Sequence, residues 1–205
     1  MDQKTRGITF AASSLLATVL LSACQTTAAN ADAAKLAPVV APAGAKLSTR
    51  PNEPMSWVIP NMGEAAESYY GPDSEHLIAQ VKSPLAVKSP RGLAGFLTQT
   101  FTDSGTDIVQ VNDKGWDACS YFFPDGKKLI WTSIKDRLNM PLGNWSDWRN
   151  YPQGSELYTS DRAGGNVVRL TNNKYYEAEV TVSPDGKWIV FGRMINKNMD
   201  LWIMK

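Results

Sequence analysis

Residues suited to catalysis are scarce in this sequence, which contains one histidine, His76, and two cysteines, Cys24 and Cys119. A Ser-His-Asp triad would have to use His76, yet no Gly-x-Ser-x-Gly stretch offers a nucleophilic serine. No cluster of histidine and cysteine has the spacing of a zinc site, and the glycines at 164–165 lack the lysine and helix of a phosphate-binding loop. Cys119 lies in an apolar stretch and is expected to be a buried thiol. The sequence therefore predicts no catalytic residue, no metal and no cofactor.

Long apolar runs are also missing. The longest, Ile8–Leu21, has about 14 residues, whereas a transmembrane helix needs roughly 20. It follows Lys4 and Arg6 at the start of the chain. A short positive start before a short apolar run is typical of a secretory signal peptide, so we expect the protein to be exported.

The residues that end this run, Leu21-Ser22-Ala23-Cys24, resemble the lipobox of bacterial lipoproteins. The resemblance implies cleavage before Cys24 and acylation of its sulfur and its new amino group. Several acyl chains are enough for stable membrane anchoring. Gln25 follows the cysteine, and in this family a residue other than Asp there is associated with the outer membrane of Gram-negative bacteria. The alternative is a conventional signal peptide followed by an ordinary small residue.

Neither positive nor negative charge predominates in the chain that would remain after cleavage. Without residues 1–23 it carries 19 basic and 19 acidic side chains, which argues against a nucleic-acid partner. Residues 25–54 are rich in Ala, Thr and Pro and are expected to form a disordered, semi-extended tether. We therefore expect a signal peptide at 1–23, the lipidated cysteine and linker at 24–54, and a folded part at 55–205.

The folded part contains a repeated turn motif. Versions of Pro-Asp-Gly begin at Pro72, Pro124 and Pro184, which are 52 and 60 residues apart. Proline presets φ, aspartate accepts hydrogen bonds from the backbone, and glycine takes a positive φ, so each motif predicts the turn of an antiparallel hairpin. The residues given this structural role are Pro72, Asp73, Pro124, Asp125, Gly126, Pro184, Asp185 and Gly186.

Each turn is followed by two predicted strands. The first is a continuous apolar run, at residues 76–79, 128–131 and 188–191. The second alternates and begins with an acidic residue, at 107–111, 156–160 and 200–204. Helical periodicity is absent throughout, so the expected fold class is all-β.

The copy at residues 165–204 resembles the Pro-Asp-Gly (PD40, WD40-like) repeat of TolB-like β-propellers. The pattern is an outer strand ending in Leu-Thr, then Ser-Pro-Asp-Gly-Lys, an apolar strand, and Asp-Leu-Trp. The resemblance covers about residues 64–205 and implies four-stranded antiparallel blades, about three of them. Family members usually close a ring of six or seven blades, and an open part-ring exposes strand edges. We therefore expect a partial propeller that continues beyond Lys205 or is completed by another chain.

One segment, between Lys135 and Gly154, interrupts the repeat. Insertions in propeller loops gather on one face of the disc, where binding residues collect. This insertion is rich in residue types that are common at binding hot spots. The candidate partner-binding residues are Trp145, Trp148, Arg149 and Tyr151. The alternative is that these aromatic side chains cover the insertion's own small core.

These features favour a non-enzymatic scaffold in the cell envelope. The resemblances imply a periplasmic propeller, lipid-anchored to the membrane, that binds a protein or envelope partner. Two alternatives from other classes are the propeller of a prolyl-oligopeptidase-like serine peptidase whose catalytic domain lies outside this chain, and a carbohydrate-binding propeller that uses the 145–151 loop. The repeats themselves do not identify the partner, because one fold supports many functions.

Overall fold

The computed structural model describes residues 40–48, 50–88, 92 and 94–205. The predicted signal peptide, Cys24 and the first part of the linker lie outside these residues. The elements are β1 (Lys46–Leu47), β2 (Trp57–Val58), β3 (Ala65–Tyr70), β4 (His76–Lys82), β5 (Phe96–Thr102), β6 (Val109–Gln110), β7 (Asp117–Phe122), β8 (Lys128–Ser133), η1 (Trp148–Asn150), β9 (Glu156–Asp161), β10 (Val168–Arg169), β11 (Tyr176–Val182), β12 (Ile189–Ile195) and β13 (Asn198–Met204).

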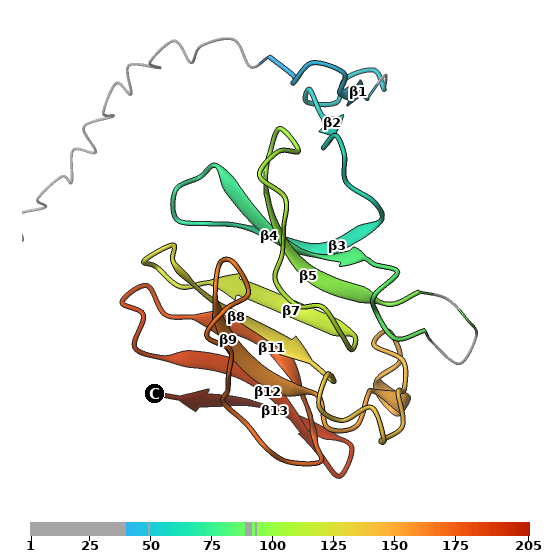
Figure 1. Ribbon diagram of the computed structural model, residues 1–205, viewed down its shortest axis with the longest axis vertical. Coiled ribbons are helices and arrows are strands. Elements are labelled where there is room, and N and C mark those ends of the chain that lie inside the picture. The colour runs from blue at the N-terminus through green and yellow to red at the C-terminus, as the bar shows by residue number, and fades with distance from the viewer. Residues whose placement is uncertain (1–39, 49, 89–91, 93) are drawn as a thin grey trace, which may run out of the picture. The chain divides into compact units, whose positions relative to one another are not determined.

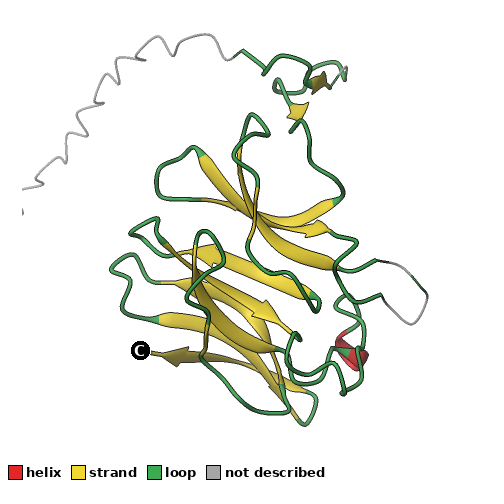
Figure 2. Ribbon diagram, viewed as in Figure 1, coloured by secondary structure: helices red, strands yellow, loops and turns green. Residues whose placement is uncertain are grey.

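Three antiparallel sheets follow one another along the chain as propeller blades (Figure 1). The first blade has the strand order β3-β4-β5-β6 and the second β7-β8-β9-β10, while the third contains β11-β12-β13. Strands β7 and β11 contact each other, and β3 and β4 contact β7, so neighbouring blades pack through their inner strands. Figure 2 shows that strands and loops make up nearly all of the described chain, with η1 as a single 3-10 turn. The expected all-β, partial propeller is confirmed.

The Pro-Asp-Gly motifs form the turns between the first two strands of each blade. In the second blade Asp125 Oδ1 accepts hydrogen bonds from the backbone N–H groups of Lys127 (2.9 Å) and Lys128 (3.1 Å). Gly126 has a φ of +65°, and its Cα lies against Pro72 of the preceding turn. Ser74 takes the glycine position of the first turn with a φ of +59°. The turns of successive blades are thus stacked along one edge, which we call the turn face.

The apolar strands after the turns supply the core between blades. Leu129, Ile130 and Trp131 are fully buried, as the sequence predicts for a strand covered on both sides. The Trp131 ring stacks on Tyr158 with centroids 4.8 Å apart, and its Nε1 donates to Ser160 Oγ (3.0 Å). These contacts lie within the second blade, and both rings belong to a core cluster that also includes Ile78 and Val111 of the first blade.

The strand predicted at 107–111 is shorter than expected and is the fourth strand of the first blade instead of the third. The third strand there is β5, and residues 107–111 contribute only β6, the two-residue outer strand that pairs with β5. Strand β5 shows no clear pattern of apolar residues, because its buried positions include Thr98, Thr100 and Thr102. Likewise, the sequence copy at 165–204 spans two sheets, since β10 pairs with β9 while β11 starts the next blade.

Part of the predicted linker lies within the described residues. Strand β1 pairs with β2 in a two-stranded antiparallel ladder, which crosses the expected boundary at residue 54. Beyond the ladder, Ile59 and Met62 pack against Leu77, Val81 and Phe101 of the first blade.

Candidate functional site

The insertion at 135–154 forms a closed loop between β8 and β9 (Figure 1). The backbone N–H of Asn144 donates to the Asn150 carbonyl (2.7 Å), which draws the two arms of the loop together. Asp147 caps η1, because its Oδ1 accepts from the Arg149 N–H (3.1 Å). Hydrogen bonds within the insertion therefore hold its backbone, and so fix where its side chains begin.

The four candidate binding residues divide into two pairs. Tyr151 stacks on Tyr176 of β11 with ring centroids 4.1 Å apart, and Trp145 lies 5.8 Å from the same ring. These two side chains are partly buried against the core that lies between the second and third blades. Trp148 is 50% exposed, and the Arg149 guanidinium lies 4.6 Å above its ring. One pair anchors the insertion, and the other faces solvent; the partner-binding role of all four stays a prediction.

Three loops meet beside this anchored pair and enclose an open cleft of about 360 Å³. They are the insertion, the connection before β11, and the β12–β13 turn, all at the end of the blades opposite the turn face. We call it the basic aromatic cleft and define it by Trp148, Arg149, Tyr151, Lys174, Tyr176 and Lys197.

The cleft combines positive charge with aromatic walls. Arg149, Lys174 and Lys197 are exposed, and no carboxylate is among the lining residues. Within the described ranges, none of these three cations makes an ion pair. Burial raises the pKa of Tyr151, so its hydroxyl is uncharged at neutral pH. This arrangement can attract an anion and contact its apolar neighbours.

A second feature lies on the inner strands, each of which carries a β-bulge. The bulges place Glu67, Cys119 and Glu179 at positive φ values of 53°, 36° and 56°. The Cys119 N–H donates to Glu67 Oε2 (2.7 Å), which links the first blade to the second. Around Cys119 and Glu179 lies a shallow hollow of about 300 Å³, lined also by Tyr69 and Tyr121.

Cys119 is buried, as expected, with 5% of its surface exposed. Burial, together with the nearby carboxylates of Glu67 and Glu179, raises the pKa of its thiol far above the ordinary value. The thiolate is the nucleophilic form of cysteine, and this environment disfavours it. Cys119 therefore has a structural role in the bulge of β7.

His76 bridges two carboxylates. Its Nδ1 lies 2.7 Å from Asp73 Oδ2, and its Nε2 lies 3.0 Å from Asp107 Oδ2. Hydrogen bonds from the backbone N–H groups of His76 and Glu75 are the main reason that the pKa of Asp73 falls to about 2. Because both of its ring nitrogens are bonded, His76 links the first turn to the β5–β6 connection.

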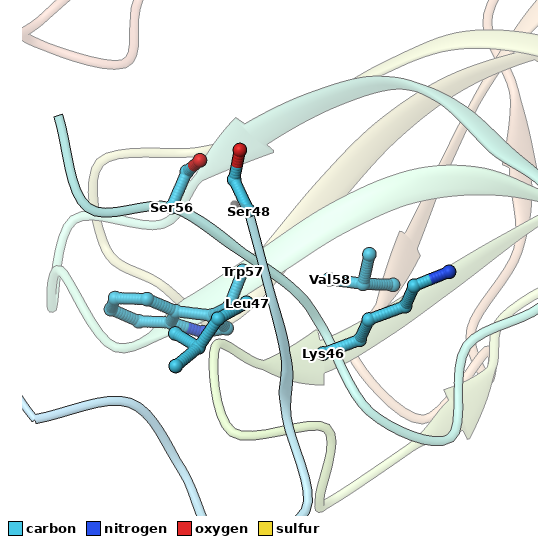
Figure 3. A pocket seen from close by; sticks show the side chains of 6 residues that line it. All are labelled: Lys46, Leu47, Ser48, Ser56, Trp57 and Val58. Atoms are coloured by element: carbon cyan, nitrogen blue, oxygen red, sulfur yellow. The ribbon is translucent and has the colours of Figure 1, made fainter. Parts of the chain in front are cut away.

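The β1–β2 ladder borders a further open pocket of about 280 Å³ (Figure 3). Trp57 and Leu47 lie together on one side of it, and the hydroxyl groups of Ser48 and Ser56 point to another. Its six lining residues include neither a carboxylate nor a histidine.

The described residues were also compared with the requirements of metal sites and of membrane-spanning helices. Within the described part of the chain, no group of three or more His, Cys, Asp and Glu side chains is arranged to hold a metal ion. None of the helices among those residues has the length and hydropathy to cross a membrane.

Sequence reasoning missed Lys174, Lys197 and the bulge residues. A usable signal existed for the bulges, since Glu67, Cys119 and Glu179 each stand five residues before the proline of a turn motif. No such signal exists for the two lysines, because only folding brings their loops beside the insertion.

No family model matches the chain. Among solved structures, a protein assigned as TolB from Agrobacterium tumefaciens is 19% identical, with a TM-score of 0.52, over 74% of this chain and 47% of that one. The fold is that of a TolB-like β-propeller. TolB from Acinetobacter baumannii is also 19% identical, with a TM-score of 0.46, over 65% of this chain and 28% of that protein. This chain thus spans less than half the length of these two structures.

Proposed function

We propose that this chain is a lipid-anchored protein of the periplasm, held through Cys24 at the outer membrane, whose propeller is a non-enzymatic scaffold that binds a protein partner. The TolB-like fold supports a propeller scaffold. The lipobox-like residues at 21–24 and the proline-containing segment after them support export, anchoring and a tether. The division into 1–23, 24–54 and 55–205 belongs to this proposal.

The observation that carries the binding role is the construction of the insertion. Exposed Trp148 and Arg149 are held on a loop that Tyr151 and Trp145 fix to the third blade. Tryptophan, arginine and tyrosine dominate the energetics of protein interfaces. A loop that is ordered before binding loses less conformational entropy when the partner arrives.

The settings of the two most reactive side chains favour binding over catalysis. His76 engages both ring nitrogens with carboxylates, and the Cys119 thiol is held protonated. A carboxylate on one ring nitrogen is what a triad histidine has, but the second nitrogen of His76 is also bonded to a carboxylate and not to a serine or cysteine whose proton it could accept.

Site-specific photocrosslinking in cells tests the proposed function. A benzophenone amino acid in place of Trp148 should give a discrete adduct with an envelope protein after irradiation. The matched control carries the same amino acid in place of Lys127, which is exposed on the turn face. Adducts of equal yield at both positions, or none at position 148, would contradict a binding face at the insertion.

A further inference from the structure

We infer that the basic aromatic cleft binds the carboxylate side chains of an acidic peptide segment, an inference that rests on the proposed protein-binding function and specifies its partner. The cleft gathers three cations from three separate loops. Like charges that share a site repel one another, and an anion bound between them relieves that repulsion. The chain as a whole has a formal net charge of only +1, so this concentration of positive charge is local.

Arg149 is suited to a carboxylate in particular. Its guanidinium lies above the Trp148 ring, which supports the planar group from one side. None of the described side chains accepts a hydrogen bond from it; only its backbone N–H is bonded, to Asp147. A stacked guanidinium retains its N–H edge for a bidentate pair with a carboxylate.

The aromatic walls favour a peptide over a sugar. A sugar ring stacks on an open aromatic face, and such faces are few here, because Arg149 covers one face of Trp148 and Tyr151 and Tyr176 stack on each other. These aromatic residues and Met194 line the cleft. They can contact the methylene groups of a glutamate while its carboxylate meets the cations.

Carboxylates near the cleft serve other contacts. Asp147 caps η1 through the Arg149 N–H. Glu179 Oε1 lies 3.5 Å from the Tyr176 hydroxyl and lines the inner-strand hollow. Both carboxylates keep their negative charge and act on Tyr151, but neither lines the cleft, and among the described residues neither forms an ion pair with Arg149, Lys174 or Lys197.

Fluorescence anisotropy of the purified full chain in nonionic detergent tests the inference. The probe is a labelled (Gly-Glu)4 peptide, and its matched control is (Gly-Gln)4, which replaces each carboxylate by an amide. A labelled oligogalacturonate of equal charge supplies the sugar arm. We expect binding of the glutamate peptide only, with an affinity that falls as salt rises because exposed charges are screened.

Charge variants locate the site. Arg149→Gln and Lys197→Glu should each weaken binding of the glutamate peptide by about tenfold, the scale of one hydrogen-bonded charge. Lys127→Glu makes the same charge change as Lys197→Glu, but at the opposite end of the blades. It should leave the affinity within about twofold, since salt screens exposed charges at long range.

Several results would overturn the inference. They are equal binding of the two peptides, equal weakening by Lys127→Glu and Lys197→Glu, preference for oligogalacturonate, or no binding of any probe. If the crosslink at position 148 persists in cells while the glutamate peptide fails to bind, the acidic chemistry is wrong and the proposed binding face stands. If neither the crosslink nor the peptide binding is observed, the proposed function is contradicted as well.

Discussion

Asp117 is a fully buried carboxyl group at the seam between the first two blades. Its Oδ2 accepts hydrogen bonds from the backbone N–H and the hydroxyl of Thr98 (both 2.9 Å), and its Oδ1 accepts from Asn112 Nδ2 (2.8 Å). Burial outweighs these bonds and raises the pKa of Asp117 to about 6. The seam therefore contains a group that changes charge just below neutral pH.

This predicts a pH-dependent stability with a definite sign. The pKa of Asp117 is about 6 when folded and about 3.9 when unfolded, so the folded state binds the proton more tightly. Relative to Asp117→Asn, the free energy of unfolding of the wild type should rise as pH falls from 7.5 to 4.5, by about 2 kcal/mol. Urea unfolding of both proteins across this range measures the difference. Parallel pH profiles would show that Asp117 does not titrate there.

Ser74 offers a second residue-scale prediction, because it occupies a left-handed conformation that the other turns give to glycine. Its φ is +59°, and Gly126 has +65° at the corresponding position. Ser74→Gly should raise the free energy of unfolding by about 1 kcal/mol by removing strain, and Gly126→Ala should lower it by a similar amount. Denaturant midpoints measure both changes. A loss of stability in Ser74→Gly would mean that the serine makes a compensating contact.

At the scale of elements, the insertion allows anchoring and binding to be separated. Tyr151 stacks on Tyr176, whereas Trp148 is half exposed. Tyr151→Ala should lower the free energy of unfolding by about 2 kcal/mol or more through lost burial and stacking. Trp148→Ala should change it by less than about 0.5 kcal/mol.

The same pair decides between the two interpretations of the insertion. If the loop binds a partner, Trp148→Ala reduces capture of that partner while its melting temperature stays unchanged. Tyr151→Phe retains the ring and serves as the control for the hydroxyl group. If Trp148→Ala lowers the melting temperature as much as Tyr151→Ala, the exposed pair belongs to the insertion's own core and the binding prediction fails.

The elements also show what the sequence could reveal. Strands β8 and β12 were predictable because a turn motif precedes an apolar run. The run of β8 is buried on both faces, whereas Val190 in the run of β12 is only partly buried. Strand β5 was not, since buried threonines replace the apolar residues and Thr98 bonds to Asp117 of the next blade. When buried residues are polar and bond to the neighbouring blade, the strand's own sequence shows no apolar periodicity.

At the scale of the whole molecule, the candidate site depends on contacts between distant segments. The insertion supplies Trp148 and Arg149, which composition alone makes candidates, but the cleft also needs Lys174 and Lys197. These come from connections that the repeat pattern treats as ordinary loops. Their shared location follows from the antiparallel order of the second and third blades, which places all three loops at one end.

The proposed membrane attachment of the molecule can be tested at Cys24. The chain has only two cysteines, and Cys119 is buried, so acyl label on the protein should depend on Cys24 alone. In a Gram-negative host grown with an alkyne fatty acid, the wild type should be labelled and recovered with the outer membrane. Cys24→Ala should lose the label and keep its first 23 residues, which intact mass reveals.

Cys119→Ala is the matched control and should remain labelled, because it retains Cys24 and removes only a buried cysteine of β7. An unlabelled wild type that is cleaved and released into the periplasm would favour the conventional signal peptide. Such a protein would have lost the two-chain attachment that makes anchoring stable. Its binding face would then have to find its partner by diffusion, at a rate set by charge steering toward the cleft.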